Sequence, residues 1–383
     1  MKDNQFGELA VIGMNGCGAF ADQVDYYLKD WRRHGDNDRS FLIEADCPRF
    51  GSGEAKGIIH ESMRGKDVYI ICDTFNYGVT YKMYGMTVPM SPDDHYADLK
   101  RIIAAIEGKA RRLTVIMPML YEGRQHKRSS RESLDCALML QELVGMGVSN
   151  ILTFDAHDSR ISNAIPLSGF DNVRPAYQMI KALIRAVPDV QIDKDHMVII
   201  SPDEGAMSRC MYYSSVLGLD IGMFYKRRNY SVVINGRNPI EAHEYLGQDL
   251  HGKDAIVVDD MISSGESMLD VCKQLKERGA NRVFCCAAFG LFTDGFDKFD
   301  QAYKEGTLDR VLTTNLIYRR PELLEKPWFV DVNMCKYVAY LIDSLNDDDT
   351  ISSLLNPIKR IQSLMEKHRK DLAEQMKINF EEK

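Results

Sequence analysis

The stretch Ala255-Ile-Val-Val-Asp-Asp-Met-Ile-Ser-Ser-Gly-Glu-Ser-Met268 governs the interpretation of the whole chain. It opens with four apolar residues, a pattern typical of a buried strand. Two acids, Asp259 and Asp260, stand where that strand is predicted to end, and small hydroxyl residues and a glycine follow them. From Met268 to Leu275, apolar residues recur at helical spacing. The stretch therefore predicts a strand, a short polar loop and a helix.

Such a unit is suited to binding a sugar phosphate. In an open α/β sheet, ligands bind at the carboxyl ends of the strands. A loop that enters a helix offers free backbone N–H groups and the positive end of the helix dipole, which suit a phosphate group. Adjacent carboxylates suit ribose hydroxyls or a hydrated Mg²⁺ ion. The alternative is an ordinary strand–helix connection that carries a solvated acidic pair.

This loop resembles the phosphoribosyl-diphosphate motif of phosphoribosyltransferases and ribose-phosphate diphosphokinases, and the match runs from Val257 to Ser267. The resemblance implies that the two acids hold the ribose hydroxyls and that the hydroxyl residues bind the 5-phosphate. The loop residues predicted to bind ribose 5-phosphate are Asp259, Asp260, Ser263, Ser264, Gly265 and Ser267. Glu266 departs from the motif, in which glycine is common at this position. A carboxylate there repels phosphate unless it points away or meets Mg²⁺.

Length and composition set outer limits on the function. The chain has 383 residues, enough for two domains, with an ordinary globular balance of 45% hydrophobic and 27% charged residues. A net charge of −8 argues against nucleic-acid binding. No segment approaches the roughly 18 consecutive apolar residues of a membrane span, and no signal peptide is visible. The nine cysteines form no C-x-x-C pair, so we expect reduced thiols in a cytoplasmic protein without a membrane partner.

Three segments of the first half suggest an ATP site. Phe50-Gly-Ser-Gly-Glu54 reads as a glycine turn, and it resembles the diphosphokinase segment Phe-x-Asp-Gly-Glu, which contributes to an ATP site between subunits. The basic loop 121–132 follows a predicted strand, where arginines suit triphosphate oxygens, and it resembles the family's Arg-Gln-Asp loop. Asp155-Ala-His157 ends another predicted strand, and the equivalent histidine of the family helps to hold Mg²⁺ on ATP. The predicted ATP-binding residues are Phe50, Glu54, Arg124, Gln125 and His157.

The second half of the chain shows the same pattern of predicted strands that end in charged loops. Ser201-Pro-Asp203 places an acid after a strand and resembles a family motif whose acid lies near ribose 5-phosphate and the metal. A further strand leads into Lys226 and Arg228, which the resemblance identifies as the catalytic cations. A solvated basic patch is the alternative for these residues. The polar stretch 229–252 that follows is predicted to be a mobile arm that brings these cations over a reacting triphosphate.

The chain is thus identified, by resemblance over about residues 9 to 345, as a member of the ribose-phosphate diphosphokinase family. The resemblance implies an α/β fold of two similar phosphoribosyltransferase-like domains, Rossmann-like with mostly parallel sheets. The predicted domains are an ATP-binding domain at 1–170, a ribose-5-phosphate-binding domain at 171–345 and a helical extension at 346–383. The extension is expected to break or kink at Pro357, and the segment 80–96 is interpreted as an insertion or lid of unassigned structure.

The implied reaction converts ATP and ribose 5-phosphate into 5-phosphoribosyl 1-diphosphate and AMP. Mg²⁺ is the implied cofactor, with His157 and Asp203 as its predicted contacts, and a homo-oligomer (dimer or hexamer) is expected. Two alternatives remain, a phosphoribosyltransferase and a non-catalytic regulatory relative. The second is kept open by the departures from the family pattern at Ser52, His126, Glu204 and Glu266.

Overall fold

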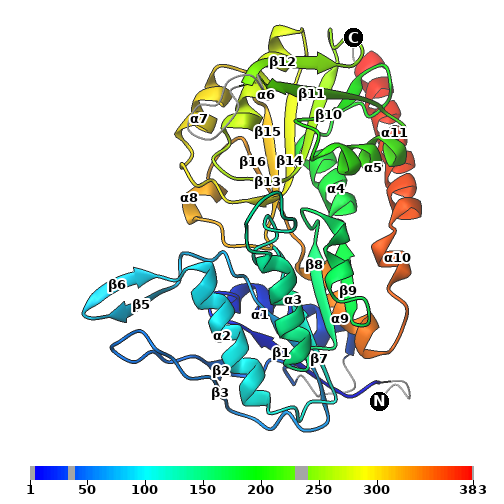
Figure 1. Ribbon diagram of the computed structural model, residues 1–383. Helices are drawn as coiled ribbons and strands as arrows, with labels where there is room; N and C mark the ends of the chain where they lie inside the picture. The colour runs from blue at the N-terminus through cyan, green and yellow to red at the C-terminus, as the bar shows by residue number, and fades with distance from the viewer. Residues whose placement is uncertain (1–4, 33–38, 229–239, 382–383) are drawn as a thin grey trace. The chain divides into compact units, whose positions relative to one another are not determined.

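The computed structural model describes residues 5–32, 39–228 and 240–381 (Figure 1). The chain divides into two compact units, each built around its own sheet. The first unit comprises residues 1–175, 315–320 and 333–356, and the second comprises residues 176–314, 321–332 and 357–383. The predicted domains follow one another along the chain, with boundaries after residues 170 and 345. In the structure, segments of the two units alternate near the C-terminus instead. The predicted domain boundaries stay predictions.

The first unit contains a five-stranded parallel sheet in the order β1-β4-β7-β8-β9. Its inner strands are almost entirely buried, as expected of apolar runs in a sheet covered on both faces. The strands are β1 (Glu8–Gly13), β4 (Lys66–Ile71), β7 (Arg112–Ile116), β8 (Asn150–Phe154) and β9 (Gly169–Val173).

Two small antiparallel ribbons accompany this sheet, β2 (Ala45–Asp46) with β3 (Ile58–Ile59) and β5 (Thr80–Met83) with β6 (Met86–Pro89). The segment 80–96, unassigned from the sequence, therefore consists of the second ribbon and the start of a helix. The helices of the unit are α1 (Gly18–Arg32), α2 (Pro92–Ile106), α3 (Asp135–Gly145), a 3₁₀ helix (Ser159–Ala164), α9 (Cys335–Asn346) and α10 (Ser352–Leu355).

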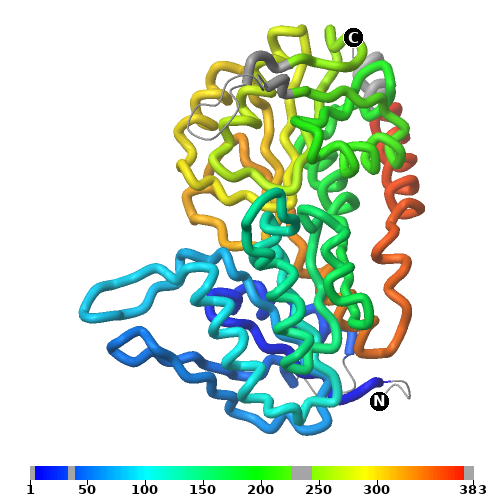
Figure 2. Tube along the Cα trace, viewed as in Figure 1, coloured from blue at the N-terminus to red at the C-terminus, as the bar shows by residue number. Residues whose placement is uncertain are grey.

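Helix α9 lies against α1 although the two are far apart in sequence, as the orange and dark blue segments of Figure 2 show. Trp31 stacks on Tyr340 with ring centroids 4.2 Å apart, and Arg32 donates to Asp343 and Asn346. These contacts explain why residues 333–356 belong with the N-terminal sheet.

The second unit contains a seven-stranded sheet in the order β12-β11-β10-β13-β14-β15-β16, parallel except for β12. The strands are β10 (Met197–Ser201), β11 (Asp220–Arg228), β12 (Ile240–Leu246), β13 (Asp254–Ile262), β14 (Val283–Gly290), β15 (Arg310–Thr314) and β16 (Phe329–Val332). The prediction that β13 ends at the two acids is wrong. The strand continues to Ile262 because its backbone stays paired with β14 as far as Ile262 and Gly290.

The helices of the second unit are α4 (Ala176–Ala186), α5 (Met207–Leu217), α6 (Glu266–Glu277), α7 (Asp297–Lys304), α8 (Pro321–Leu324) and α11 (Ile358–Glu381). A fully buried Trp328 lies in its core, stacked on Phe299 with centroids 5.3 Å apart, and its indole Nε1 donates to Asp300. Two α/β units with mostly parallel sheets confirm the predicted fold class.

The C-terminal extension is helical and interrupted where the sequence predicts. Helix α10 ends at Leu355, and α11 begins after Asn356-Pro357 and packs beside α4 and α5 (Figure 1). His368 of α11 is buried and its Nε2 lies 2.7 Å from the carbonyl oxygen of Val190. Among the helices of the described ranges, none combines the length and the hydropathy needed to cross a bilayer.

Candidate active site

The acids predicted to bind the sugar lie at one edge of the second sheet. Strands β10 and β13 are parallel neighbours, with Ile200 opposite Val257, so their carboxyl ends meet at the same edge. Asp203 follows the end of β10, where its Oδ1 accepts a hydrogen bond from the backbone N–H of Ala206. Asp259 and Asp260 follow Val257 along β13. Sheet register thus brings Asp203 to the same edge as Asp259 and Asp260, from which it is far apart in the sequence.

A buried arginine that the sequence analysis missed lies against this acidic pair. Nη1 of Arg209, on α5, lies 3.6 Å from Oδ1 of Asp259 and 3.9 Å from Oδ1 of Asp260. Burial and then the neighbouring Asp260 carboxylate raise the pKa of Asp259 well above its usual range, and Arg209 acts in the opposite direction. The signal that could have revealed Arg209 is its position among apolar residues on the buried face of a predicted helix.

The loop between β13 and α6 turns through a glycine with a left-handed backbone conformation. Gly265 has φ +87° and immediately precedes α6, whose first backbone N–H groups have no carbonyl acceptor within the helix. A Cβ atom at Gly265 would lie 2.3 Å from Cζ of the buried Phe299, so no larger residue fits. The predicted residues Ser263, Ser264 and Ser267 surround this glycine.

The departure at Glu266 is accommodated by a partner on another helix. Lys298 of α7 forms an ion pair with Glu266, and its Nζ also lies 3.9 Å from Asp294. The carboxylate is therefore partly neutralised. Glu204, another departure, is exposed, and its backbone oxygen accepts from Met207 at the start of α5.

For the predicted catalytic residues Lys226 and Arg228, the structure describes only the backbone. Lys226 and Arg228 stand at the end of β11, which pairs with β12 in antiparallel fashion. Their side chains lie outside the described residues, as does the part of the predicted arm at 229–239. Their catalytic role stays a prediction.

In the first unit, the turn that carries Phe50 and Glu54 is well defined. The N–H of Phe50 donates to the carbonyl of Glu54, and Phe50 is 56% exposed and so available for stacking. Ser52, which replaces the family's acid, donates from Oγ to the Glu54 carboxylate at 2.8 Å. The turn packs on the β5–β6 ribbon, where the N–H of Tyr84 donates to the carbonyl of Gly51.

The loops after β7 and β8 bring two histidines together. The rings of His126 and His157 lie 5.2 Å apart between centroids, and Nε2 of His126 lies 3.5 Å from Oδ2 of Asp158. The Nδ1 atom of His126 is buried without a hydrogen-bond partner among the described residues. Gln125 donates from Nε2 to the carbonyl of Ser133, and Arg124 is exposed. His126, a departure from the family loop, therefore stands beside the predicted ligand His157.

The structure thus forms two groups of predicted residues, one in each unit. The ATP-binding set lies in the first unit, and the ribose-5-phosphate set lies in the second. The predicted metal contacts His157 and Asp203 are divided between the units, and their sharing of one ion stays a prediction.

Comparisons with known proteins agree with this arrangement. The family model described as the N-terminal domain of ribose phosphate pyrophosphokinase matches residues 9–147, and the phosphoribosyl transferase domain model matches residues 170–315. The chain belongs to the ribose-phosphate pyrophosphokinase family. The recognition made from the motifs is therefore confirmed.

Similar proteins cover most of the chain. A ribose-phosphate pyrophosphokinase of Vibrio parahaemolyticus is 28% identical over 324 residues, which span 82% of this chain and 92% of the relative. Ribose-phosphate pyrophosphokinase A of Dictyostelium discoideum is 26% identical and is covered to 92% of its length. The crystal structure of phosphoribosylpyrophosphate synthetase from Mycobacterium smegmatis has a TM-score of 0.70 at 22% identity, with 89% of this chain and 99% of that chain covered, which supports the fold.

Proposed function

We propose that this protein is a ribose-phosphate diphosphokinase, which transfers the β,γ-diphosphoryl group of ATP to the 1-hydroxyl of ribose 5-phosphate. The products are 5-phosphoribosyl 1-diphosphate and AMP. The observation that carries the proposal is the meeting of Asp203, the Asp259–Asp260 pair and the Gly265 turn at one sheet edge. It occurs in a chain whose residues 9–147 match the model of the N-terminal domain of ribose phosphate pyrophosphokinase.

The sugar phosphate would bind across the second unit. Asp259 and Asp260 would accept hydrogen bonds from the ribose hydroxyls, and relief of their mutual repulsion would favour that binding. The backbone N–H groups at the start of α6, with Ser263, Ser264 and Ser267, would hold the 5-phosphate. This orientation would leave the 1-hydroxyl without contacts to the acids or the loop, and so available for reaction.

ATP would bind through the first unit. The exposed face of Phe50 suits adenine stacking, and Glu54 can accept from a base amine while it also accepts from Ser52. Arg124 and Gln125, in the loop after β7, would contact the phosphates together with His157.

The reaction is an in-line displacement at the β-phosphorus. The oxygen of the ribose 1-hydroxyl forms a bond to that phosphorus and its proton passes to solvent, while the bond to the bridging oxygen of the α-phosphate breaks and AMP leaves with that oxygen. Lys226 and Arg228 are the residues we propose to stabilise the charge that develops in the transition state. Such chemistry needs positioned cations and exclusion of water more than it needs a strong base.

The donor atoms at the sheet edge fit Mg²⁺. Magnesium prefers oxygen ligands and keeps several waters, and Asp203 offers a partly exposed carboxylate. An imidazole is a less usual ligand for this ion, so we propose that His157 contacts a bound water or a phosphate oxygen. When bound, Mg²⁺ would neutralise phosphate charge.

A coupled assay of AMP formation with Mg²⁺, ATP and ribose 5-phosphate, and without any nucleobase, tests the proposal. We expect AMP to appear only when ribose 5-phosphate is present, in equal amount to 5-phosphoribosyl 1-diphosphate. A turnover that requires a nucleobase would identify a phosphoribosyltransferase. Binding of both substrates without any turnover would identify a regulatory relative, since the departures at Ser52, His126, Glu204 and Glu266 would then have abolished catalysis.

A further inference from the structure

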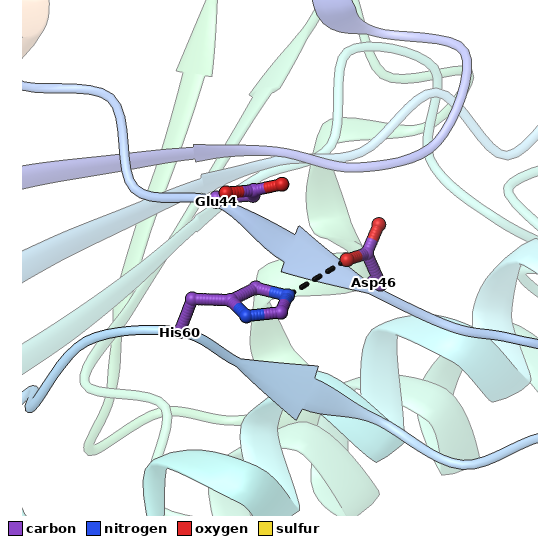
Figure 3. A group of neighbouring side chains, drawn as sticks. All are labelled: Glu44, Asp46 and His60. Carbon is purple, nitrogen blue, oxygen red and sulfur yellow. Dashed lines mark hydrogen bonds and ion pairs between the residues drawn. The ribbon is translucent and has the colours of Figure 1, made fainter.

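Outside the proposed substrate site, three potential metal ligands converge on the β2–β3 ribbon of the first unit. Ala45 pairs with Ile59, and the N–H of His60 donates to the carbonyl of Glu44, so Glu44 and His60 stand opposite each other. Side chains two residues apart on a strand share a face, which places Asp46 beside Glu44. Figure 3 shows these side chains on the two facing chain segments, with His60 directed toward Asp46. The backbone pairing therefore holds the three residues together.

The ligand atoms are close enough for one ion to contact all three. One carboxylate oxygen each from Glu44 and Asp46 and one ring nitrogen of His60 lie within 4.8 Å of one another. Nε2 of His60 and Oδ2 of Asp46 are 2.8 Å apart, a separation that adjacent ligands of one metal ion also adopt. All three side chains are exposed, so an ion can enter and keep water in its remaining positions.

We propose that Glu44, Asp46 and His60 form a binding site for a borderline divalent metal ion of the Zn²⁺ type. One imidazole and two carboxylates suit zinc and its first-row neighbours, whereas Mg²⁺ and Ca²⁺ prefer sites made of oxygen alone. Among the described residues, Asp46 is paired only with His60, and Glu44 forms no ion pair. A metal cation supplies the charge that this carboxylate pair lacks.

The neighbouring Cys47 is not a ligand in this arrangement. Its thiol donates to the carbonyl of Asp98 on α2, so it is directed at that helix and not at the three ligand atoms of the ribbon. The proposed ligands are therefore one nitrogen and two oxygen atoms. Such a site binds a metal ion more weakly than one with a thiolate, and the bound ion can exchange with ions in solution.

The position of the site indicates what an ion would do there. Glu44 and Asp46 precede the segment 47–57, His60 follows it, and this segment carries the turn of Phe50 and Glu54. The ribbon that closes the segment has only two residues on each strand and is marginal by itself. A metal ion that joins both ends restricts the segment and stabilises the turn. The consequence for adenine binding rests on the proposed function.

Calorimetric titration of the chelator-treated full chain with Zn²⁺, in millimolar Mg²⁺ and without ATP, tests the site. Magnesium competes for sites made of oxygen alone, so the titration reports mainly sites that contain nitrogen or sulfur. We expect a Zn²⁺ site in the unaltered chain whose affinity falls at least tenfold in Glu44→Gln, Asp46→Asn and His60→Ala. The matched control is His196→Ala, since His196 is also exposed and lies 2.7 Å from Asp193, but no third potential ligand joins this pair among the described residues. Equal Zn²⁺ binding by His60→Ala and the unaltered chain would overturn the site.

Hydrogen exchange of residues 47–57 tests the structural consequence. Zn²⁺ should slow exchange in this segment in the unaltered chain and in His196→Ala, and leave it unchanged in His60→Ala. Unchanged exchange on Zn²⁺ binding by the unaltered chain would overturn the restraint. Neither measurement uses ATP, ribose 5-phosphate or turnover, so failure of the proposed activity and failure of this metal site are separately visible.

Discussion

Lys298 of α7 lies with its Nζ 2.5 Å from Oε1 of Glu266, the residue that replaces a glycine of the phosphate-binding motif. The pair joins the beginnings of two helices that stand next to the proposed 5-phosphate site. A carboxylate that would otherwise repel a phosphate is thereby held and partly neutralised. The residue that pairs with Glu266 lies 32 positions further along the chain.

The first prediction concerns this pair. Lys298→Ala should weaken ribose 5-phosphate binding several-fold, because Glu266 is then left as an unscreened charge near the phosphate. Isothermal titration at low salt measures the effect, which should shrink as ionic strength rises. Lys304→Ala, which removes the same charge from an exposed position of the same helix, serves as the control. Equal effects of the two variants would show that only net charge matters.

The second prediction concerns Gly265. Gly265→Ala should destabilise the protein by about 1–3 kcal/mol and weaken ribose 5-phosphate binding, because the added Cβ collides with a Phe299 ring that is fully buried and stacked on Trp328. Gly252→Ala is a matched control, because Gly252 also has a positive φ, +73°, but a Cβ added there would have no atom within 4 Å. Urea unfolding measures the stability that each variant loses. The loss in Gly252→Ala reports backbone strain alone, and any further loss in Gly265→Ala reports the collision with Phe299. Equal destabilisation would contradict the role of Phe299.

The third prediction concerns the buried arginine. Arg209→Met should cost about 1–3 kcal/mol of stability, because it removes a buried cation that lies beside the partly exposed Asp259 and the buried Asp260. The double variant Arg209→Met with Asp259→Asn should recover part of that loss, since one of the two like charges is gone. Urea unfolding at pH 7 measures both. A double variant that is no more stable than the single one would show that charge is not what Arg209 contributes.

The fourth prediction is a pH dependence set by Asp73 in the first unit. Asp73 is buried at the carboxyl end of β4, and burial raises its pKa from 3.8 to about 6 although the N–H groups of Phe75 and Tyr318 donate to it. The folded pKa exceeds the unfolded value, so the contribution to stability is fully present below about pH 4 and is lost as pH rises through 6.

Over that window the unaltered chain should lose up to about 3 kcal/mol relative to Asp73→Asn, at 1.36 kcal/mol for each unit of pKa shift. Urea unfolding of both proteins at pH 4 and pH 7 isolates the contribution of Asp73 to stability, because the two proteins share all other titrating groups. The stability difference between the two proteins should change with pH in the stated direction. A difference that is independent of pH would mean that Asp73 titrates near its ordinary value in the folded state.

The fifth prediction concerns the proposed catalytic cation. Lys226→Ala should lower kcat by at least about a hundredfold with little change in ribose 5-phosphate affinity, because Lys226 acts on charge in the transition state. Steady-state kinetics and titration of ribose 5-phosphate separate the two quantities. Equal losses in turnover and in binding would remove Lys226 from the catalytic role and make it a substrate-binding residue.

The sequence by itself determined the elements of the sheets and the nature of the fold. Buried strands such as β4 and β13 are apolar runs, α6 follows from apolar residues at helical spacing, and Pro357 predicts the break before α11. These features depend on residues that are neighbours along the chain, and their periodicity records which side of one element is buried. The ordered motifs were enough to recognise the family for the same reason, since each motif is a local strand-end loop.

Tertiary structure alone decided which of these residues meet. The pairing of Arg209 with the acids of β13, of Lys298 with Glu266, and of His60 with Asp46 each joins residues that no local pattern connects. Even the length of β13 was misjudged, because its last residues are held by pairing to β14 rather than by their own apolar character. Such contacts depend on strand order and register, which follow from the packing of the whole unit and not from the periodicity of any one segment.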